Sequence, residues 1–93
     1  MFAIGDAEWP GISKLVEEMG EVGQVIGKLM ATHGEAVHWD GDGNLVDRLT
    51  EEMADLQAAI WFASESNNLQ IMERALAKYQ LFGKWHDERR ARA

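Results

Sequence analysis

Two short acidic motifs carry the residue types in this chain that are most suited to chemistry. They are Glu17-Glu18-Met19-Gly20-Glu21 and Glu51-Glu52-Met53-Ala54-Asp55, and in each a glutamate doublet is followed three residues later by another carboxylate. On an α-helix, residues three apart project from the same side about one turn apart. Two such helices facing each other would bring four carboxylates together, and such oxygen ligands suit hard divalent cations, Mg²⁺ above all.

The position of each glutamate on its expected helix favours a metal site rather than glutamates that are simply exposed to solvent. At about 100° per residue, Glu18 falls on the flank of an apolar face and Glu52 falls inside one, whereas Glu17 and Glu51 point outward. A carboxylate turned toward a core is costly, because desolvation disfavours its charged form. Two such carboxylates at matching offsets indicate a shared cation. The alternative is that these glutamates are solvated surface residues.

Apolar spacing predicts three main helices, over about 10–31, 45–66 and 68–90, and hence an all-α helical bundle. Trp9-Pro10 is expected to open the first helix, since proline suits the first turn. Gly23 and Gly27, at the edge of its apolar face, are expected to allow close approach of another helix. The residues expected to face the core are Ile12, Leu15, Val16, Met19, Val22, Ile26 and Met30 in the first helix, Leu45, Leu49, Met53, Leu56, Ile60 and Ala63 in the second, and Leu69, Met72, Ala75, Leu76, Tyr79 and Phe82 in the third.

Residues 32–44 interrupt this pattern, and two Asp-Gly pairs within them predict turns. His33, His38 and Asp40 raise the alternative of a second metal site, and Glu35-x-x-His38 has the spacing of a di-iron ligand pair. This spacing carries little weight, because a di-iron bundle needs the motif twice on helices. Trp39 is expected to anchor the loop on the bundle.

Composition narrows the classes of protein. A chain of 93 residues predicts one domain, 1–93, and a domain of this size buries only roughly two-thirds of its unfolded surface, so oligomerisation would complete the bundle. A net charge of −7 argues against nucleic-acid binding. No apolar run approaches the ~20 residues of a membrane span, and no signal peptide is apparent. The absence of cysteine fits a cytoplasmic protein without disulfides.

At Glu17-Glu18-x-x-Glu21 followed by Glu52-x-x-Asp55, the sequence resembles the MazG-like nucleoside triphosphate pyrophosphohydrolases of the all-α NTP pyrophosphatase superfamily. The segment from Trp9 to Leu15 and the ending around Lys78, Phe82 and Trp85-His86 extend the resemblance over most of the chain. It implies a homodimer or homotetramer that hydrolyses (d)NTPs to monophosphate and pyrophosphate. The longer gap between the acidic motifs and the short N-terminal lead-in depart from many members.

The resemblance implies Mg²⁺, with Mn²⁺ as an alternative, bound by Glu18, Glu21, Glu52 and Asp55. No protein nucleophile is evident, so a metal-activated water would attack the α-phosphorus. Glu17 and Glu18 are the expected catalytic acids, with Glu17 placed to orient water or to remain a solvated residue. The candidates for contacts with substrate are Lys14, Lys28, Lys78, Lys84 and Trp85, with Trp9 and Trp39 as further candidates for base stacking.

Two other classes of function stay open on sequence alone. One is a non-enzymatic acidic helical module for oligomerisation or interaction. The other is a related enzyme with a different substrate, such as a dUTP or dCTP pyrophosphatase or a phosphoribosyl-ATP pyrophosphohydrolase.

Overall fold

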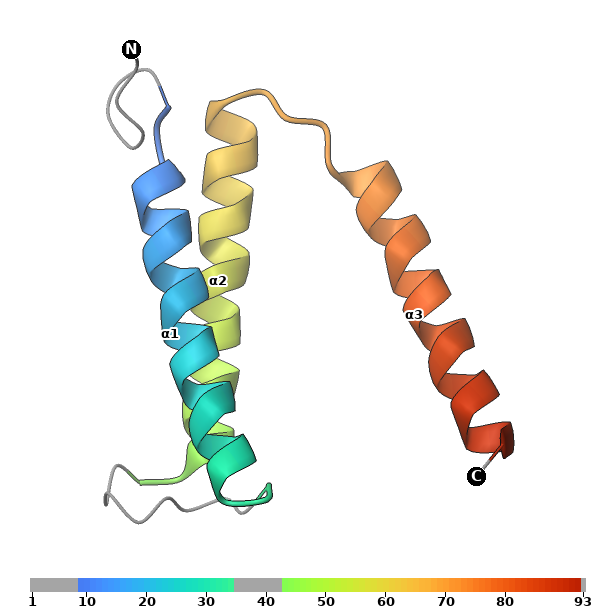
Figure 1. Ribbon diagram of the computed structural model, residues 1–93. Coiled ribbons are helices and arrows are strands. Elements are labelled where there is room, and N and C mark those ends of the chain that lie inside the picture. The colour runs from blue at the N-terminus through green and yellow to red at the C-terminus, as the bar shows by residue number, and fades with distance from the viewer. Residues whose placement is uncertain (1–8, 35–42, 93) are drawn as a thin grey trace.

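The computed structural model describes residues 9–34 and 43–92 and contains three helices. These are α1 (Ile12–Ala31), α2 (Leu45–Ser66) and α3 (Met72–Arg92). Figure 1 shows α1 and α2 side by side in antiparallel directions, with α3 standing apart from both. The prediction of an all-α chain with three main helices is therefore confirmed for the part of the chain that is described.

Helix α1 begins later than predicted because a glycine, not Pro10, sets its start. Gly11 is the N-cap and has φ of 85°, a left-handed conformation that L-residues with a side chain rarely adopt. A Cβ atom at Gly11 would lie only 2.6 Å from the Cδ1 atom of the Phe62 ring on α2. The close approach of these two helices at this end thus requires glycine.

The other ends of the hairpin formed by α1 and α2 follow standard capping chemistry. Asn44 caps α2, and its side-chain oxygen accepts hydrogen bonds from the backbone N–H groups of Val46 (2.9 Å) and Asp47 (3.1 Å). Both helices finish in a Schellman motif, with His33 (φ 56°) and Asn68 (φ 55°) in the left-handed position. These caps fix where each helix stops, and they match the predicted ends closely.

The contact face between α1 and α2 is narrow. Among the described residues, the buried apolar side chains are Val25, Leu45, Ala59 and Ala63, and the buried polar ones are Glu18 and Ser64. Several residues predicted to face a core are instead exposed, because no third helix of the described part of the chain packs on the α1–α2 pair. They are Val16, Met19, Ile26, Met30, Met53, Leu69, Met72, Leu76, Tyr79 and Phe82.

Helix α3 makes no packing contact with the hairpin. Within the described residues, none of its Cα atoms lies within 8 Å of a Cα of α1 or α2. It also begins at Met72 rather than near residue 68, because the Schellman motif at Asn68 turns the chain out of helix before α3 starts. The radius of gyration is 16.6 Å, against about 12 Å expected for a compact domain of this length.

The structure also bears on the predictions for the glycines of α1 and for membrane spans. Gly23 and Gly27 meet no other atoms within 4 Å at the position of an added Cβ, so no helix of this chain approaches them closely. None of the described helices is long and apolar enough to span a membrane. The expectations for Glu35, His38, Trp39 and Asp40 fall in 35–42, outside the described residues.

Candidate metal centre

Three of the four predicted metal ligands come together between α1 and α2. Glu18 of α1 and Glu52 and Asp55 of α2 each offer a carboxylate oxygen, and these oxygens all lie within 4.8 Å of one another. The antiparallel pairing places the first acidic motif beside the second, so the helical spacing of each motif aims its carboxylates at one region. This is the juxtaposition that the sequence predicted for Glu18, Glu52 and Asp55.

The fourth predicted ligand, Glu21, lies beside the three through its contact with Glu52. The hydrogen bond between the Glu52 and Glu21 carboxyl groups is the main cause that raises the pKa of Glu52 above its usual value. Desolvation and the charges of Glu21, Asp55 and Glu18 raise it further. Carboxylates gathered in this way repel one another, and a bound cation would relieve that repulsion.

Burial differs sharply within each glutamate doublet. Glu18 is only 6% exposed, whereas the side chain of Glu17 is 55% exposed. Glu52 is half-buried and Glu51 is exposed. The structure therefore turns the second member of each doublet inward, in the phase that the helical periodicity predicts.

Two carboxylate oxygens in the centre are buried without a hydrogen-bond donor. They are Oε2 of Glu18 and Oε2 of Glu52, judged over the residues that the structure describes. A buried, unpaired carboxylate oxygen is costly, and the usual remedies are a hydrogen bond, an ion pair or a metal ion. Because the groups gathered here are all carboxylates, the donor set is one that fits Mg²⁺ or Mn²⁺ rather than a soft metal.

Lys14 supplies a positive charge beside Glu18 and Glu17. Its Nζ atom lies 3.4 Å from Oε1 of Glu18 and 3.4 Å from Oε2 of Glu17, and its side chain is 60% exposed. The hydrogen bonds to Glu18 and then to Glu17 raise the pKa of the Lys14 ammonium above its usual value. One exposed ammonium thus balances part of the charge on Glu18 while the opposite oxygen, Oε2, has no donor.

A cleft of about 470 Å³ opens beside the carboxylates. Glu18 and Asp55 contribute to its wall together with Lys14 and the ring of Phe62. This volume lies within the range of small-ligand sites, about 300–1,000 Å³. The sequence analysis did not single out Phe62 as a binding residue. The sequence feature that could have indicated Phe62 is its position seven residues after Asp55, because residues seven apart lie on the same side of a helix.

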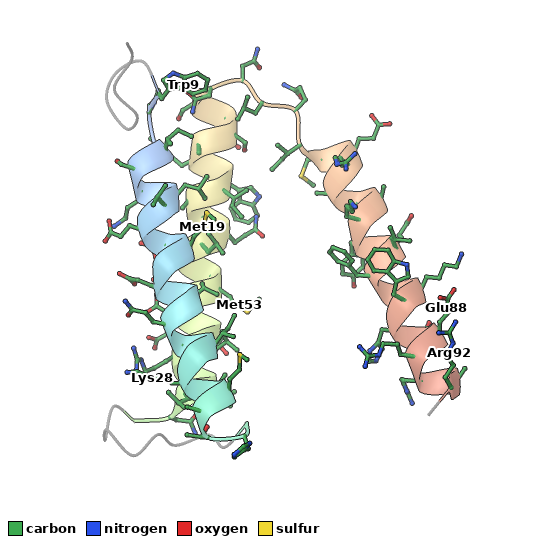
Figure 2. The ribbon with its side chains drawn as sticks, viewed as in Figure 1. Trp9, Met19, Lys28, Met53, Glu88 and Arg92 are labelled. Carbon is green, nitrogen blue, oxygen red and sulfur yellow. The ribbon has the colours of Figure 1, made fainter. Side chains whose placement is uncertain are left out.

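The remaining predicted substrate contacts are not brought to the carboxylates. Figure 2 shows Lys28 near the C-terminal end of α1, and its ten-residue separation from Glu18 corresponds to about 15 Å along the helix. Lys78, Lys84 and Trp85 belong to α3, which does not contact the hairpin. Trp9 lies at the end of the hairpin where α1 begins (Figure 2).

Comparisons with protein-family models, with curated proteins and with solved structures found no match for this chain. Its function is therefore inferred from the residues and their geometry.

Proposed function

We propose that this chain is a Mg²⁺-dependent nucleoside triphosphate pyrophosphohydrolase of the MazG-like kind, which hydrolyses (d)NTPs to (d)NMPs and pyrophosphate. The observation that carries the proposal is the pair of buried, donor-free oxygens on Glu18 and Glu52, which lie in one cluster with Asp55. Surface glutamates remain hydrated and do not need to share a cation. Carboxylates that are held out of water at the contact between two helices need a cation to balance their charge.

Glu18, Glu52 and Asp55 would hold the ion, and Glu21 would complete the set from its position against Glu52. A bound Mg²⁺ supplies positive charge that polarises phosphate oxygens and lowers the pKa of water. Mn²⁺, with similar ligand preferences, is the alternative ion. The two helices would orient the ion, because α1 and α2 pack against each other and so fix the positions of the carboxylates that they carry.

The cleft would take the rest of the nucleotide. Lys14 lies at its wall with an ammonium that can contact phosphate oxygens, and Phe62 offers an aromatic ring, 58% exposed, on which a base can stack. Glu17 accepts a hydrogen bond from Lys14 at 3.4 Å, and its side chain is 55% exposed. Glu17 is thus placed to accept a proton or orient water without being buried itself.

The proposed assembly is a homo-oligomer, at least a dimer. Large apolar residues are exposed on all three described helices, among them Met19 (57%) on α1, Met53 (56%) on α2, and Leu76 (58%) and Tyr79 (76%) on α3. Large apolar side chains exposed in this number are characteristic of an interface between chains. Association would complete the bundle that α1 and α2 begin.

A substrate panel tests the activity. Purified protein is incubated with each of the common (d)NTPs and with phosphoribosyl-ATP, in Mg²⁺ or in EDTA, and scored for pyrophosphate. We expect release from at least one nucleotide in Mg²⁺ and none in EDTA. The matched control pair is Glu18→Gln, expected to be inactive, and Glu51→Gln, expected to retain activity. Absence of pyrophosphate from every nucleotide, with unaltered melting on adding Mg²⁺, would leave the non-enzymatic interaction module as the function.

A further inference from the structure

Helix α3 carries an apolar stripe that neither of the other two described helices covers. Met72, Leu76, Tyr79 and Phe82 recur at helical spacing, and each is at least 57% exposed. At 100° per residue they lie within an arc of about 120°, which is the width of a helix face that packs against other helices. Phe82 contacts Trp85, with ring centroids 5.7 Å apart, so the aromatic end of the stripe is itself ordered.

The hairpin carries a matching apolar face. On α1 it contains Val16, Met19, Ile26 and Met30, and on α2 it contains Val46 and Met53, all more than 40% exposed. Figure 2 shows Met19 and Met53 among the side chains of this hairpin. Because the two helices are antiparallel and their buried faces meet, these residues lie on the same side of the hairpin. We call this side the Met19–Met53 flank. The flank is long enough to receive a second helix along its length.

This apolar flank faces away from Glu21 and Asp55, whereas Glu18 and Glu52 lie at the contact face between α1 and α2. Met19 and Glu21 are two residues apart, as are Met53 and Asp55, so each pair diverges by about 200° around its helix. A helix docked on the methionines therefore leaves the carboxylates and the Phe62 cleft open. Docking and metal binding are consequently separable, and the inference drawn below does not rest on the proposed enzymatic function.

The charges of the two parts are complementary. The two helices of the hairpin hold eight acidic and three basic residues, a net −5, whereas α3 holds three acidic and six basic residues, a net +3. Opposite net charges favour encounter and suppress pairing of like parts, hairpin with hairpin or α3 with α3. The natural partner of α3 is thus a hairpin of this same sequence.

The end of α2 directs α3 away from its own hairpin. Leu69 donates its backbone N–H to the carbonyl of Ser64 at 2.8 Å, which completes the Schellman motif around Asn68. Asn67 donates its side-chain amide to the carbonyls of Pro10 (2.9 Å) and Ala63 (2.7 Å). These bonds tie the exit from α2 to the start of α1. The residues that follow run sideways from the end of α2, and α3 then descends at a distance from the hairpin and slants away from it (Figure 1).

From these observations we infer that two copies of this chain exchange α3, so that the stripe of each α3 packs on the Met19–Met53 flank of the other copy's hairpin. The exchange covers both apolar surfaces at once and pairs a basic helix with an acidic hairpin. It also explains why residues with the periodicity of a core are exposed in one chain.

Two complementary variants test the exchange. Met53→Lys alters the receiving flank, and Leu76→Glu alters the stripe of α3. Each variant alone forms a pair in which both docking sites are altered, so we expect its dimer to dissociate on the order of a hundredfold more readily. An equimolar mixture can form a mixed dimer in which one of the two docking sites is unaltered and the other pairs Lys with Glu.

We therefore expect light scattering to show a dimer for the unaltered chain and monomers for each variant at the same concentration. Native mass spectrometry of the mixture should show dimers that contain one copy of each variant. The control substitutions are Ala54→Lys and Ala77→Glu, which place the same charges on neighbouring exposed positions outside the apolar faces and should leave the dimer unchanged. A monomeric unaltered chain, dimeric single variants, or a mixture without mixed dimers would each overturn the exchange.

Discussion

The hairpin and α3 are built from helices of similar length, 20, 22 and 21 residues, yet they differ in which side chains they bury and expose. The hairpin buries a carboxylate, Glu18, while α3 buries no residue and exposes Met72, Leu76 and Tyr79. The hairpin has therefore formed its contact face within one chain, at the cost of enclosing charge. Helix α3 has the apolar pattern of a packed helix, yet it contacts neither α1 nor α2. The buried carboxylate indicates a bound cation, and the exposed apolar residues of α3 indicate a protein partner.

The largest expected effect comes from the buried member of each doublet. Glu18→Gln and Glu52→Gln should lower the rate of pyrophosphate release by about a thousandfold or more, because each removes a charged oxygen that would hold the ion. Glu17→Gln and Glu51→Gln should lower it by less than about tenfold, since both side chains are exposed. Steady-state kinetics on the four variants measures this. If Glu51→Gln were as damaging as Glu52→Gln, burial would not identify the functional carboxylates.

A second substitution breaks the hairpin itself. Gly11→Ala should destabilise the fold by about 2–3 kcal/mol, because the new Cβ would meet the Phe62 ring and the residue would be held at positive φ. In a domain of this size that lowers the melting temperature by on the order of 10 °C.

The matched control is Gly20→Ala, where an added Cβ meets no atom within 4 Å and the residue lies inside α1. It should stabilise the chain by about 0.5–1 kcal/mol, because alanine has the higher helix propensity. Thermal melting followed by circular dichroism distinguishes the two. Equal melting temperatures for both variants would show that the contact between Gly11 and Phe62 does not hold the hairpin together.

A smaller effect is expected at Lys14. Its ammonium partly neutralises Glu18, so it competes with a cation for the same carboxylate. Lys14→Met should therefore tighten Mg²⁺ binding by roughly three- to tenfold in titration calorimetry without nucleotide, a modest change because the lysine is exposed. Lys28→Met, at the far end of α1, should leave the affinity unchanged. Weaker Mg²⁺ binding by the Lys14 variant would contradict this competition.

The pH dependence of the metal-free protein gives the smallest effect. The folded state raises the pKa of Glu52 above 4.5, so the folded chain binds this proton more tightly than the unfolded chain. The corresponding stabilisation is full below pH 4.5 and is lost as the pH rises through the folded value. In EDTA, lowering the pH from 7 toward 5 should raise the contribution of Glu52 to stability, and Glu52→Gln should remove that contribution. A steeper rise in the melting temperature of Glu52→Gln than of the unaltered chain would contradict the sign.

Sequence periodicity predicted most of the hairpin and part of its site. The bounds 45–66 for the second helix agree with α2, because Asn44 and the Asn67-Asn68 pair are local caps that can be recognised from residue type. The inward turn of Glu18 and Glu52 followed from helical phase. The Phe62 cleft did not follow, because a cleft depends on how α1 and α2 are offset against each other.

Helical periodicity could not predict which surface packs against the apolar residues. Periodicity identifies a face of α1 that contains Met19 and Ile26, but it does not say whether the same chain or another covers that face. The start of α3 was also misplaced, because Asn68 and Leu69 complete the cap of α2 instead of opening the next helix. Both differences arise at the junction between the hairpin and α3.

The most direct test of the metal centre is thermal melting in Mg²⁺ and in EDTA, with Glu52→Gln/Asp55→Asn as the control. A cation that binds only the folded chain at a hundredfold excess over its Kd stabilises it by about 2.7 kcal/mol. We predict that the unaltered chain melts on the order of 10 °C higher in Mg²⁺ than in EDTA. The double variant should melt higher than the unaltered chain in EDTA, because charge repulsion is relieved, and should gain little from Mg²⁺. Identical melting of the unaltered chain in Mg²⁺ and EDTA would contradict a metal centre formed by Glu18, Glu52 and Asp55.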